Sequence, residues 1–336
     1  MEDREIARLA ADLNARSHDA ALSKLKDKYN EALDRLQLLE QNIDLVQMLK
    51  TARPPRALTI KRESKRGTEA NTAVIVLTDW HGDQRVTPSE VGYLNEYNAT
   101  IRDQRLEKCL IHSVRLIELW REIAPIDTLI IAYLGDGFSG HIHEELKQTT
   151  WMAPPEASVW LHDALGDTIA TLERQKFKRI EVICKYGNHT RTTKEIFYSK
   201  AAVNNYEWCV CKMLANNWKG KAHWTVEEDY FTFINIYGKR VRLHHGNGAK
   251  YNGGIGGLSI PLNRSISVWN RSQPAYIDII GHWHKFNHSD TFVSIGSLIG
   301  HDPFARAKFA YEPPAQGFLV FSPDRALVCA LPIFVD

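Results

Sequence analysis

Hydrophobic residues near the N-terminus recur at alternating spacings of three and four. The series runs from Leu22 to Val46 without a Pro or Gly, and charged residues fill many of the other positions. Its seam positions are Leu22, Leu25, Tyr29, Ala32, Leu36, Leu39, Ile43 and Val46. This spacing is that of the a and d positions of a coiled coil. We therefore predict that residues 1–50 form a helical, coiled-coil segment for oligomerisation or docking. The alternative is a long helix packed on its own domain.

A basic segment follows this helical pattern. Pro54 and Pro55 end the helix, because proline removes a backbone donor and clashes with the preceding turn. Between Thr51 and Gly67, six Lys and Arg residues accompany one acid, Glu63. We predict a basic linker over residues 51–72, which is either solvated or in contact with phosphates.

From Ala73 onward, short apolar strands alternate with amphipathic helices. The first half predicts strands at 73–78, 128–134 and 179–185, and helices at 98–122, 158–175 and 200–216. The second half is mostly strand, at 230–237, 240–244, 276–280, 291–295, 317–321 and 326–331. Early helices followed by late hairpins indicate two packed mixed sheets flanked by helices, rather than a single doubly wound sheet.

The composition is that of an ordinary globular protein. The chain has 336 residues, of which 44% are hydrophobic and 24% charged, with a net charge of +2. No global field therefore draws it to nucleic acid or to a membrane, and any such partner has to be recognised locally. The five cysteines lack zinc-finger spacing and are expected to be reduced. Without a secretory signal or a run of roughly 20 apolar residues, we expect a cytoplasmic protein with no membrane partner.

Side chains that bind metals follow several of the predicted strands. They occur in Asp79-Trp80-His81, Gly135-Asp136, Gly187-Asn188-His189, His244-His245-Gly246 and Gly281-His282-Trp283-His284. Any one of these endings is more often a turn or a core histidine. Together they indicate one site, because ligands collect beyond the carboxyl ends of strands in open α/β sheets. Imidazoles and carboxylates without a thiolate suit Mn, Fe, Zn or a related divalent ion.

This ordered motif set resembles the calcineurin-like metallophosphoesterase superfamily, and the resemblance covers about Ala73 to Leu298. We assign residues 73–336 to such a domain. The resemblance implies an α/β fold, a four-layer α/β/β/α sandwich of two mixed β-sheets with a two-metal centre at the sheet ends. It implies that the first metal is held by Asp79, His81 and His284, the second by Asn188, His245 and His282, and that Asp136 bridges both. His189 would lie near the leaving group, as a general acid or as a stabiliser of charge.

The chemistry of such a centre explains these residue types. Two metals ~3.5–4 Å apart clamp the attacking and leaving oxygens, and they lower the pKa of bound water towards ~7, so that hydroxide is available. His189 can donate a proton, because an unperturbed imidazole titrates near neutrality. His245 is chosen over His244 because it directly precedes Gly246, as in the family motif. Strand alternation then turns His244 to the opposite face.

Departures from the pattern bear on the substrate. The Ser/Thr phosphatase branch has Asp-Arg where this chain has Ser139-Gly140, and Glu where it has Thr190. That branch is therefore disfavoured.

The segments 97–105 and 139–146 resemble phage and prophage phosphoesterases labelled DNA-repair exonuclease-like. The interpretation we favour is a DNA nuclease that uses two divalent ions, with Mn preferred and Fe, Zn, Ni or Co as alternatives. A small-molecule phosphatase or cyclic-nucleotide phosphodiesterase, and a non-catalytic assembly scaffold, remain the other hypotheses.

Three basic residues lie near these motifs, namely Arg191, Lys194 and Arg264. They are candidate phosphate contacts, although exposed Arg and Lys side chains are more often simply solvated. The glycine-rich stretch from Gly246 to Leu258 is either a loop that lets a bulky substrate approach or only a long connection. The patterns assign no role to His141 or His143.

Overall fold

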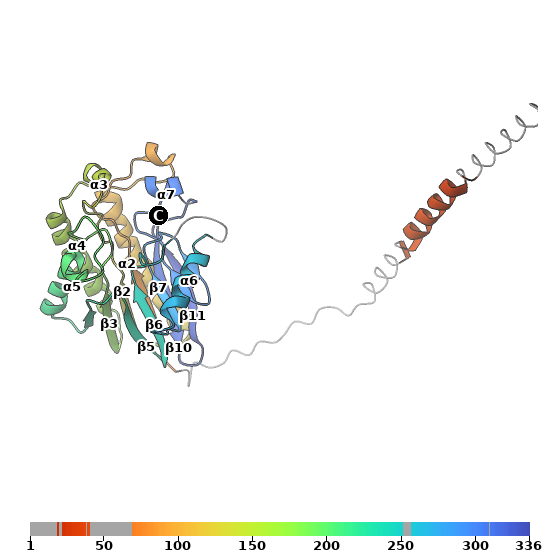
Figure 1. Ribbon diagram of the computed structural model, residues 1–336. Helices are drawn as coiled ribbons and strands as arrows, with labels where there is room; N and C mark the ends of the chain where they lie inside the picture. Colours follow the sequence, from red (N-terminus) through yellow and green to blue (C-terminus); the bar gives the residue numbers. More distant parts are fainter. Residues whose placement is uncertain (1–18, 20–21, 38, 41–68, 251–256, 309) are drawn as a thin grey trace, which may run out of the picture. The chain divides into compact units, whose positions relative to one another are not determined.

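The computed structural model describes residues 19, 22–37, 39–40, 69–250, 257–308 and 310–336 (Figure 1). Contacts divide the chain into two units, residues 1–63 and 64–336. In the first unit, residues 22–37 and 39–40 are helical. Pairing of the seam through a second chain stays a prediction, and its last positions, Ile43 and Val46, lie outside the described residues. So does the predicted linker up to residue 68.

The described part of the second unit contains two mixed β-sheets. The first has the strand order β11-β10-β1-β2-β3-β4, and the second has the order β5-β6-β7-β9-β8. The strands of the first sheet are β1 (Asn71–Leu77), β2 (Ile126–Tyr133), β3 (Arg179–Cys184), β4 (His223–Val226), β10 (Ala315–Ser322) and β11 (Ala326–Phe334). Those of the second are β5 (Thr232–Ile236), β6 (Lys239–His244), β7 (Ile277–Ile280), β8 (Asn287–His288) and β9 (Phe292–Ser294).

The central strands are parallel and buried on both faces. β1 pairs in parallel with β2, β2 with β3, and β3 with β4. In the second sheet, β6 pairs in parallel with β7. Every residue of β1 is buried, which explains its apolar run from Ala73 to Leu77, because parallel sheets are covered on both sides. Val74 and Val76 on one face of β1 pack against Ile279 and other residues of the second sheet.

Helices cover the two outer faces of this sandwich. α2 (Ala99–Ile123), α4 (Pro154–Glu173) and α5 (Tyr206–Asn217) pack on the first sheet, through a core that includes Ile75 and Leu161. α6 (Ser259–Trp269) packs on the second sheet, where its Leu262 and Ile266 contact Ile280. In Figure 1, α4 and α5 lie on one side of the sheets and α6 lies on the other. The predicted four-layer α/β/β/α sandwich is confirmed.

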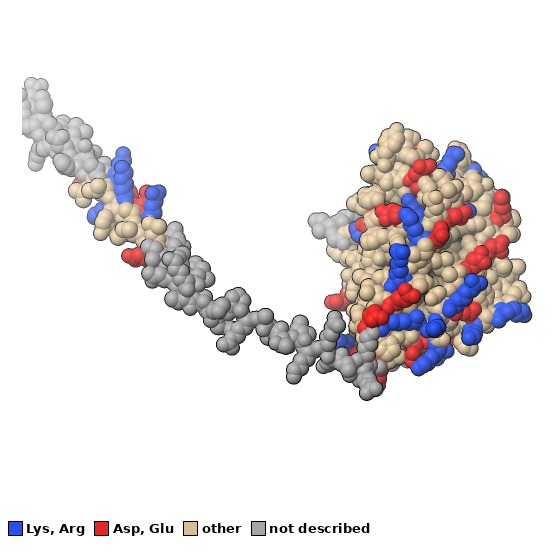
Figure 2. All heavy atoms as spheres, turned by 180° about the vertical axis from the view of Figure 1, so that it is seen from behind, with Lys and Arg blue, Asp and Glu red and all other residues tan. Residues whose placement is uncertain are grey.

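Smaller elements connect these layers. They are the helices α3 (Glu144–Thr149) and α7 (Pro303–Lys308) and the 3-10 turns η1 (Pro88–Val91) and η2 (Ala202–Asn204). None of the described helices has the length and hydrophobicity that a membrane crossing requires. Figure 2 shows one face of the domain, on which basic and acidic side chains are interspersed. That face carries no continuous basic surface.

Some sequence-based boundaries were wrong. The helix predicted over 200–216 begins only at Tyr206, since Lys200 has a φ of 56° and a 3-10 turn follows. The side chain of Asn205 then caps α5 by accepting hydrogen bonds from the N–H groups of Glu207 and Trp208. The sequence analysis also missed β4 and α6. β4 is only four residues long, and α6 contains a proline that its first turn tolerates.

Candidate metal centre

The loops after β1, β2, β3, β6 and β7 carry the candidate ligands, and they meet at one end of the two sheets. Because neighbouring parallel strands end at the same edge, their following loops lie side by side. Backbone hydrogen bonds join them: the N–H of Asp79 donates to the carbonyl of Gly135 at 2.9 Å, and that of His81 to the carbonyl of Asp136 at 3.1 Å. Across the sheets, the side chain of Asp79 accepts a hydrogen bond from the N–H of His282 at 2.8 Å.

A first group consists of Asp79, His81 and His284, whose ligand atoms lie within 4.8 Å of one another. The Nε2 atoms of His81 and His284 are 3.2 Å apart, and Nε2 of His284 is 3.5 Å from Oδ1 of Asp79. Oδ2 of Asp79 accepts hydrogen bonds from Thr78 Oγ1 and His282 N, but no described donor reaches Oδ1, which is buried. A buried carboxylate oxygen that accepts no hydrogen bond and lies beside two imidazole nitrogens fits a cation.

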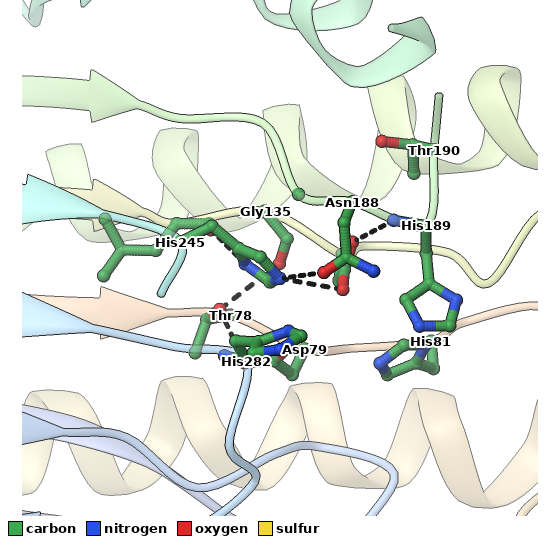
Figure 3. A network of polar contacts seen from close by, with 12 residues as sticks. Thr78, Asp79, His81, Gly135, Asn188, His189, Thr190, His245 and His282 are labelled. Atoms are coloured by element: carbon green, nitrogen blue, oxygen red, sulfur yellow. Dashed lines mark hydrogen bonds and ion pairs between the residues drawn. The ribbon is translucent and has the colours of Figure 1, made fainter. Parts of the chain in front are cut away.

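A second group consists of Asp136, His245 and His282. Nε2 of His245 lies 2.9 Å from Oδ2 of Asp136 and 3.2 Å from Oδ1 of Asn188 (Figure 3). Nδ1 of His245 donates to the carbonyl of Leu134 at 2.8 Å, which leaves Nε2 directed at the carboxylate. The structure therefore brings Asn188 to this group, and its binding of the second metal stays a prediction. His244 lies elsewhere, paired with Asp278 at 3.1 Å.

The electrostatics of the two groups suit divalent cations. Burial opposes charge on Asp136, but His245 and His189 outweigh it and hold the pKa of this carboxyl well below its usual range. The pKa of Asp79 is likewise lowered, because His284 and His245 outweigh its burial. Burial, with His245 nearby, lowers the pKa of His282 to about 3. Charged carboxylates and a neutral imidazole are the protonation states that metal ligands need. Although burial opposes it, the carboxylates also raise the pKa of His245 to about 9, and Asp79 raises that of His284, so a metal ion would have to displace a proton from each of these two imidazoles.

Unfavourable backbone conformations are concentrated at these side chains. Positive φ angles occur at Asp79 (52°), His81 (47°), Asp136 (54°), His282 (70°) and His284 (51°). Such conformations cost roughly 1–3 kcal/mol each outside glycine and persist only where the surroundings impose them. They cluster at functional sites, and here they turn each side chain back towards the centre from a tight loop.

Two glycines of the motifs are explained by close approach. A Cβ atom at Gly187 would lie 1.9 Å from Oδ1 of Asp136, and one at Gly281 would lie 2.1 Å from Oγ1 of Thr78 and 2.6 Å from Oδ2 of Asp79. None of these distances is sterically possible. Each glycine therefore makes room for a carboxylate supplied by a different strand.

The structure adds one group that the sequence analysis missed, Glu207. This fully buried carboxylate of α5 accepts hydrogen bonds from the N–H groups of Asp136 at 3.1 Å and Gly187 at 2.9 Å. It also accepts one from Thr190 Oγ1 at 2.8 Å and others from Gly137 N and the hydroxyl of Tyr133. It thereby joins the loops after β2 and β3. The signal in the sequence was a carboxylate on the apolar stripe of the helix, shared with Val210, Cys211 and Leu214.

His189 lies beside both groups. Its backbone N–H donates to Oδ1 of Asp136 at 2.9 Å, and its ring is 4.9 Å from that of His81. Nδ1 lies 3.2 Å from the carbonyl of Ser139, which can only accept, so Nδ1 carries the proton and Nε2 is left for another partner. Burial lowers the pKa of this imidazole. The exposed His143 lies nearby, with its ring 6.3 Å from that of His189.

The candidate phosphate contacts are placed differently from one another. Arg191 donates to the carbonyls of Asn188 at 2.6 Å, Thr193 at 3.1 Å and Lys194 at 3.0 Å, so it stabilises the loop after His189. Of its five N–H groups, two remain for a ligand. The side chains of Lys194 and Arg264 are exposed, and among the described residues they form no hydrogen bond or ion pair with the two groups.

Comparisons with known proteins give similarity only at the level of solved structures. No family model and no curated protein matches the chain. An archaeal phosphodiesterase is 12% identical, with 77% of this chain and 99% of that chain covered and a TM-score of 0.33. Vps29 from Entamoeba histolytica, complexed with zinc, is 13% identical, with 78% and 99% covered and a TM-score of 0.32. A hypothetical protein from Pyrococcus horikoshii OT3 is 12% identical, with 79% and 89% covered and a TM-score of 0.35. These values are too low to transfer a function.

Proposed function

We propose that the chain is a metallophosphoesterase that hydrolyses phosphodiester bonds with two divalent metal ions. The observation that carries this proposal is the convergence of two Asp/His groups at one end of the sheets, with Asp136 in contact with His81 of the first group and His245 of the second. Asp79, His81 and His284 would hold one ion, Asn188, His245 and His282 the other, and Asp136 would bridge them. When bound, such ions hold phosphate oxygens and provide a nucleophile at neutral pH.

The residues of the chain account for the remaining steps. Hydrogen bonds from His81 Nδ1 to Ser139 Oγ, whose own proton goes to Gln84, and from His245 Nδ1 to a backbone carbonyl orient these imidazoles, as ligands of metals usually require. His189 has Nδ1 bound to the carbonyl of Ser139, so its Nε2 faces away from that contact. With the pKa of this imidazole lowered, Nε2 carries no proton in the free chain. We assign His189 the role of general acid, or of a donor to the phosphoryl oxygens, after the negative charge of a bound phosphate has favoured protonation of Nε2.

The finer proposal is that the substrate is DNA and that Mn²⁺ is the preferred ion. It is supported by the resemblance of segments 97–105 and 139–146 to phage and prophage phosphoesterases. The mixed set of imidazole, carboxylate and amide ligands is compatible with Mn²⁺. Oligomerisation through the N-terminal helix belongs to the same proposal. It is supported by the exposure of Leu22, Leu25, Tyr29, Leu36 and Leu39, each between 55 and 68% exposed.

The test is metal-dependent hydrolysis by the full chain. Single- and double-stranded DNA and a chromogenic phosphodiester are incubated with and without Mn²⁺, with wild-type protein and with the Asp136→Ala variant. Cleavage of DNA that needs both Mn²⁺ and Asp136 supports a nuclease. Hydrolysis of the chromogenic diester without any attack on DNA would retain the phosphodiesterase and reject DNA as substrate. Inactivity on all substrates, with no metal bound at neutral pH, favours the scaffold hypothesis.

One observation favours a second candidate, a phosphodiesterase that acts on small nucleotides. A cavity of about 460 Å³ borders Asn188, and its volume falls in the range of roughly 300–1,000 Å³ typical of small-molecule sites. Hydrolysis of mono- or dinucleotide diesters, with no activity on DNA, would support this candidate over the nuclease.

A further inference from the structure

The cavity beside Asn188 is formed by segments far apart in the sequence. Its walls come from residues 186–205 after β3, residues 228–231 before β5, residues 247–250 after β6, and Trp269 at the end of α6. Gly187 and Asn188 belong both to the cavity and to the loop that supplies the second metal-binding group. A molecule in the cavity would therefore be adjacent to a phosphate held at the centre.

We propose that this cavity binds the nucleoside attached to the scissile phosphate. The proposal rests on the phosphodiesterase function proposed above and identifies what that site recognises beyond the phosphate. The nucleoside belongs either to a small nucleotide or to the end of a DNA strand. Both present the same chemical group, a base with its sugar, to the cavity.

Aromatic side chains form a large part of the walls among the described residues. They are Tyr186, Phe197, Tyr198, Tyr230, Phe231 and Trp269. Any of the bases can stack on an aromatic ring, because every base has a π-face. A cavity of this composition and of about 460 Å³ fits one planar base together with its sugar.

Part of the wall is rigid before any ligand arrives. The rings of Phe231 and Trp269 have centroids 5.2 Å apart in an edge arrangement. The guanidinium of Arg242 lies 5.0 Å from the first ring and 5.3 Å from the second. Arg242 is itself fixed by Asp278, whose two oxygens accept at 2.6 and 2.9 Å. Because both rings are held by this buried ion pair, little conformational entropy is lost when a base packs on them.

Another part of the wall is exposed and apolar. Three consecutive residues that line the cavity are exposed to solvent: Ile196 (48%), Phe197 (49%) and Tyr198 (93%). Contiguous apolar exposure of this kind marks binding surfaces. A bound base would cover these side chains and remove their apolar surface from water.

Charge determines the orientation of the ligand. The carboxylates of Glu228 and Asp229 line the cavity and can accept hydrogen bonds from base amino groups or sugar hydroxyls, but they repel phosphate. The basic lining residues are Arg191, whose guanidinium binds the carbonyl of Asn188, and Lys250. The phosphate therefore lies at the Asn188 end and the nucleoside extends inward.

The test separates nucleoside binding from hydrolysis. Deoxyadenosine, which carries no phosphate, is titrated calorimetrically into the metal-free full chain, the Tyr198→Ala variant and the Phe197→Ala/Tyr198→Ala double variant. We expect wild-type binding and at least a tenfold loss of affinity in the double variant. The control is Tyr93→Ala, since Tyr93 is 82% exposed and does not line the cavity. Absence of deoxyadenosine binding to the wild type, or unchanged affinity in the double variant, overturns the proposal.

A kinetic arm identifies the source of the nucleoside. KM and kcat are measured in Mn²⁺ for a dinucleotide, for linear single-stranded DNA and for methyl p-nitrophenyl phosphate, which lacks a nucleoside. A rise in KM for the dinucleotide alone in the double variant assigns the cavity to small nucleotides, and a rise for linear DNA assigns it to a strand end. An equal rise for all three substrates contradicts nucleoside recognition. If no substrate is hydrolysed but deoxyadenosine still binds, the proposed function fails and the cavity assignment stands.

Discussion

The carboxylate of Glu207 accepts a hydrogen bond from the backbone N–H of Asp136 at 3.1 Å, although 71 residues separate them. The same carboxylate accepts from Gly187 N at 2.9 Å. A residue of α5 thus fixes the two loops that supply Asp136 and Asn188. Burial and the nearby Asp136 raise the pKa of Glu207, which means that the charged carboxylate is destabilised at this position. The hydrogen bonds that it accepts offset this cost.

Replacement of Glu207 by Gln should loosen both loops. A glutamine amide has one acceptor oxygen in place of two, so buried N–H groups of the loops would lose their partners. We expect the free energy of unfolding to fall by about 2–4 kcal/mol and metal affinity to fall roughly 10–100-fold. Denaturant unfolding and metal titration measure these effects, with the exposed Glu107→Gln as control. A variant that unfolds and binds metal like the wild type would contradict this role.

Replacement of Asp136 by Ala should abolish turnover and leave the fold intact. The variant loses the carboxylate that contacts His245, and with it the proposed bridge between the two ions. We expect kcat to fall at least about a thousandfold, corresponding to roughly 4 kcal/mol of lost stabilisation. Circular dichroism checks the fold and elemental analysis the metal content. Residual activity close to wild type would exclude Asp136 as the bridging ligand.

Replacement of His189 by Ala should separate catalysis from metal binding. Its side chain contacts the carbonyl of Ser139, and it belongs to neither metal-binding group. We expect metal content to be nearly unchanged and kcat to fall roughly 10²–10⁴-fold, as for loss of a general acid. If the variant instead loses a metal ion, its assigned role is wrong.

Replacement of Gly187 by Ala should displace Asp136. The added Cβ would lie 1.9 Å from Oδ1 of Asp136, so the carboxylate or the loop has to move. We expect metal affinity to fall roughly 10–100-fold, as for other disturbances around metal ligands. Gly166→Ala in α4 is the matched control, because its Cβ would meet only Leu214 at 3.4 Å. Equal metal affinity in the two variants would refute the steric argument.

The buried Lys185 should make the free energy of unfolding depend on pH in the alkaline range. Burial lowers its pKa from 10.5 to about 8, and its Nζ donates to Thr232 Oγ1 and the carbonyl of Asp229. Between pH 8 and pH 10.5, Lys185 is protonated in the unfolded chain and deprotonated in the folded one. Its contribution to the free energy of unfolding therefore rises with pH in this range. Below pH 8 the residue is protonated in both states, and its contribution does not change with pH. The Lys185→Met variant should lack this rise in denaturant unfolding measured across the window. The exposed Lys219→Met should retain it.

The sequence alone supplied the candidate ligands of the proposed centre. Strands such as β1 and β2 are recognisable because parallel strands buried on both faces have continuous apolar sequences, and Asp79 and Asp136 directly follow them. The choice of His245 over His244 agrees with their placement, since alternation along a strand is a local property. Local periodicity was therefore sufficient for two sheets flanked by helices, and the ordered motifs after the strands, through their resemblance to a known superfamily, supplied the candidate ligands.

Only the tertiary structure decided which distant groups meet. The pairing order of the strands brings Asp79 to His284, and the packing of α5 places Glu207 behind Asp136. It also collects the aromatic walls of the cavity from three separate segments and directs Arg191 to the backbone of its own loop. Contacts between residues this far apart depend on sheet order and helix packing, which the periodicity of any one segment does not contain.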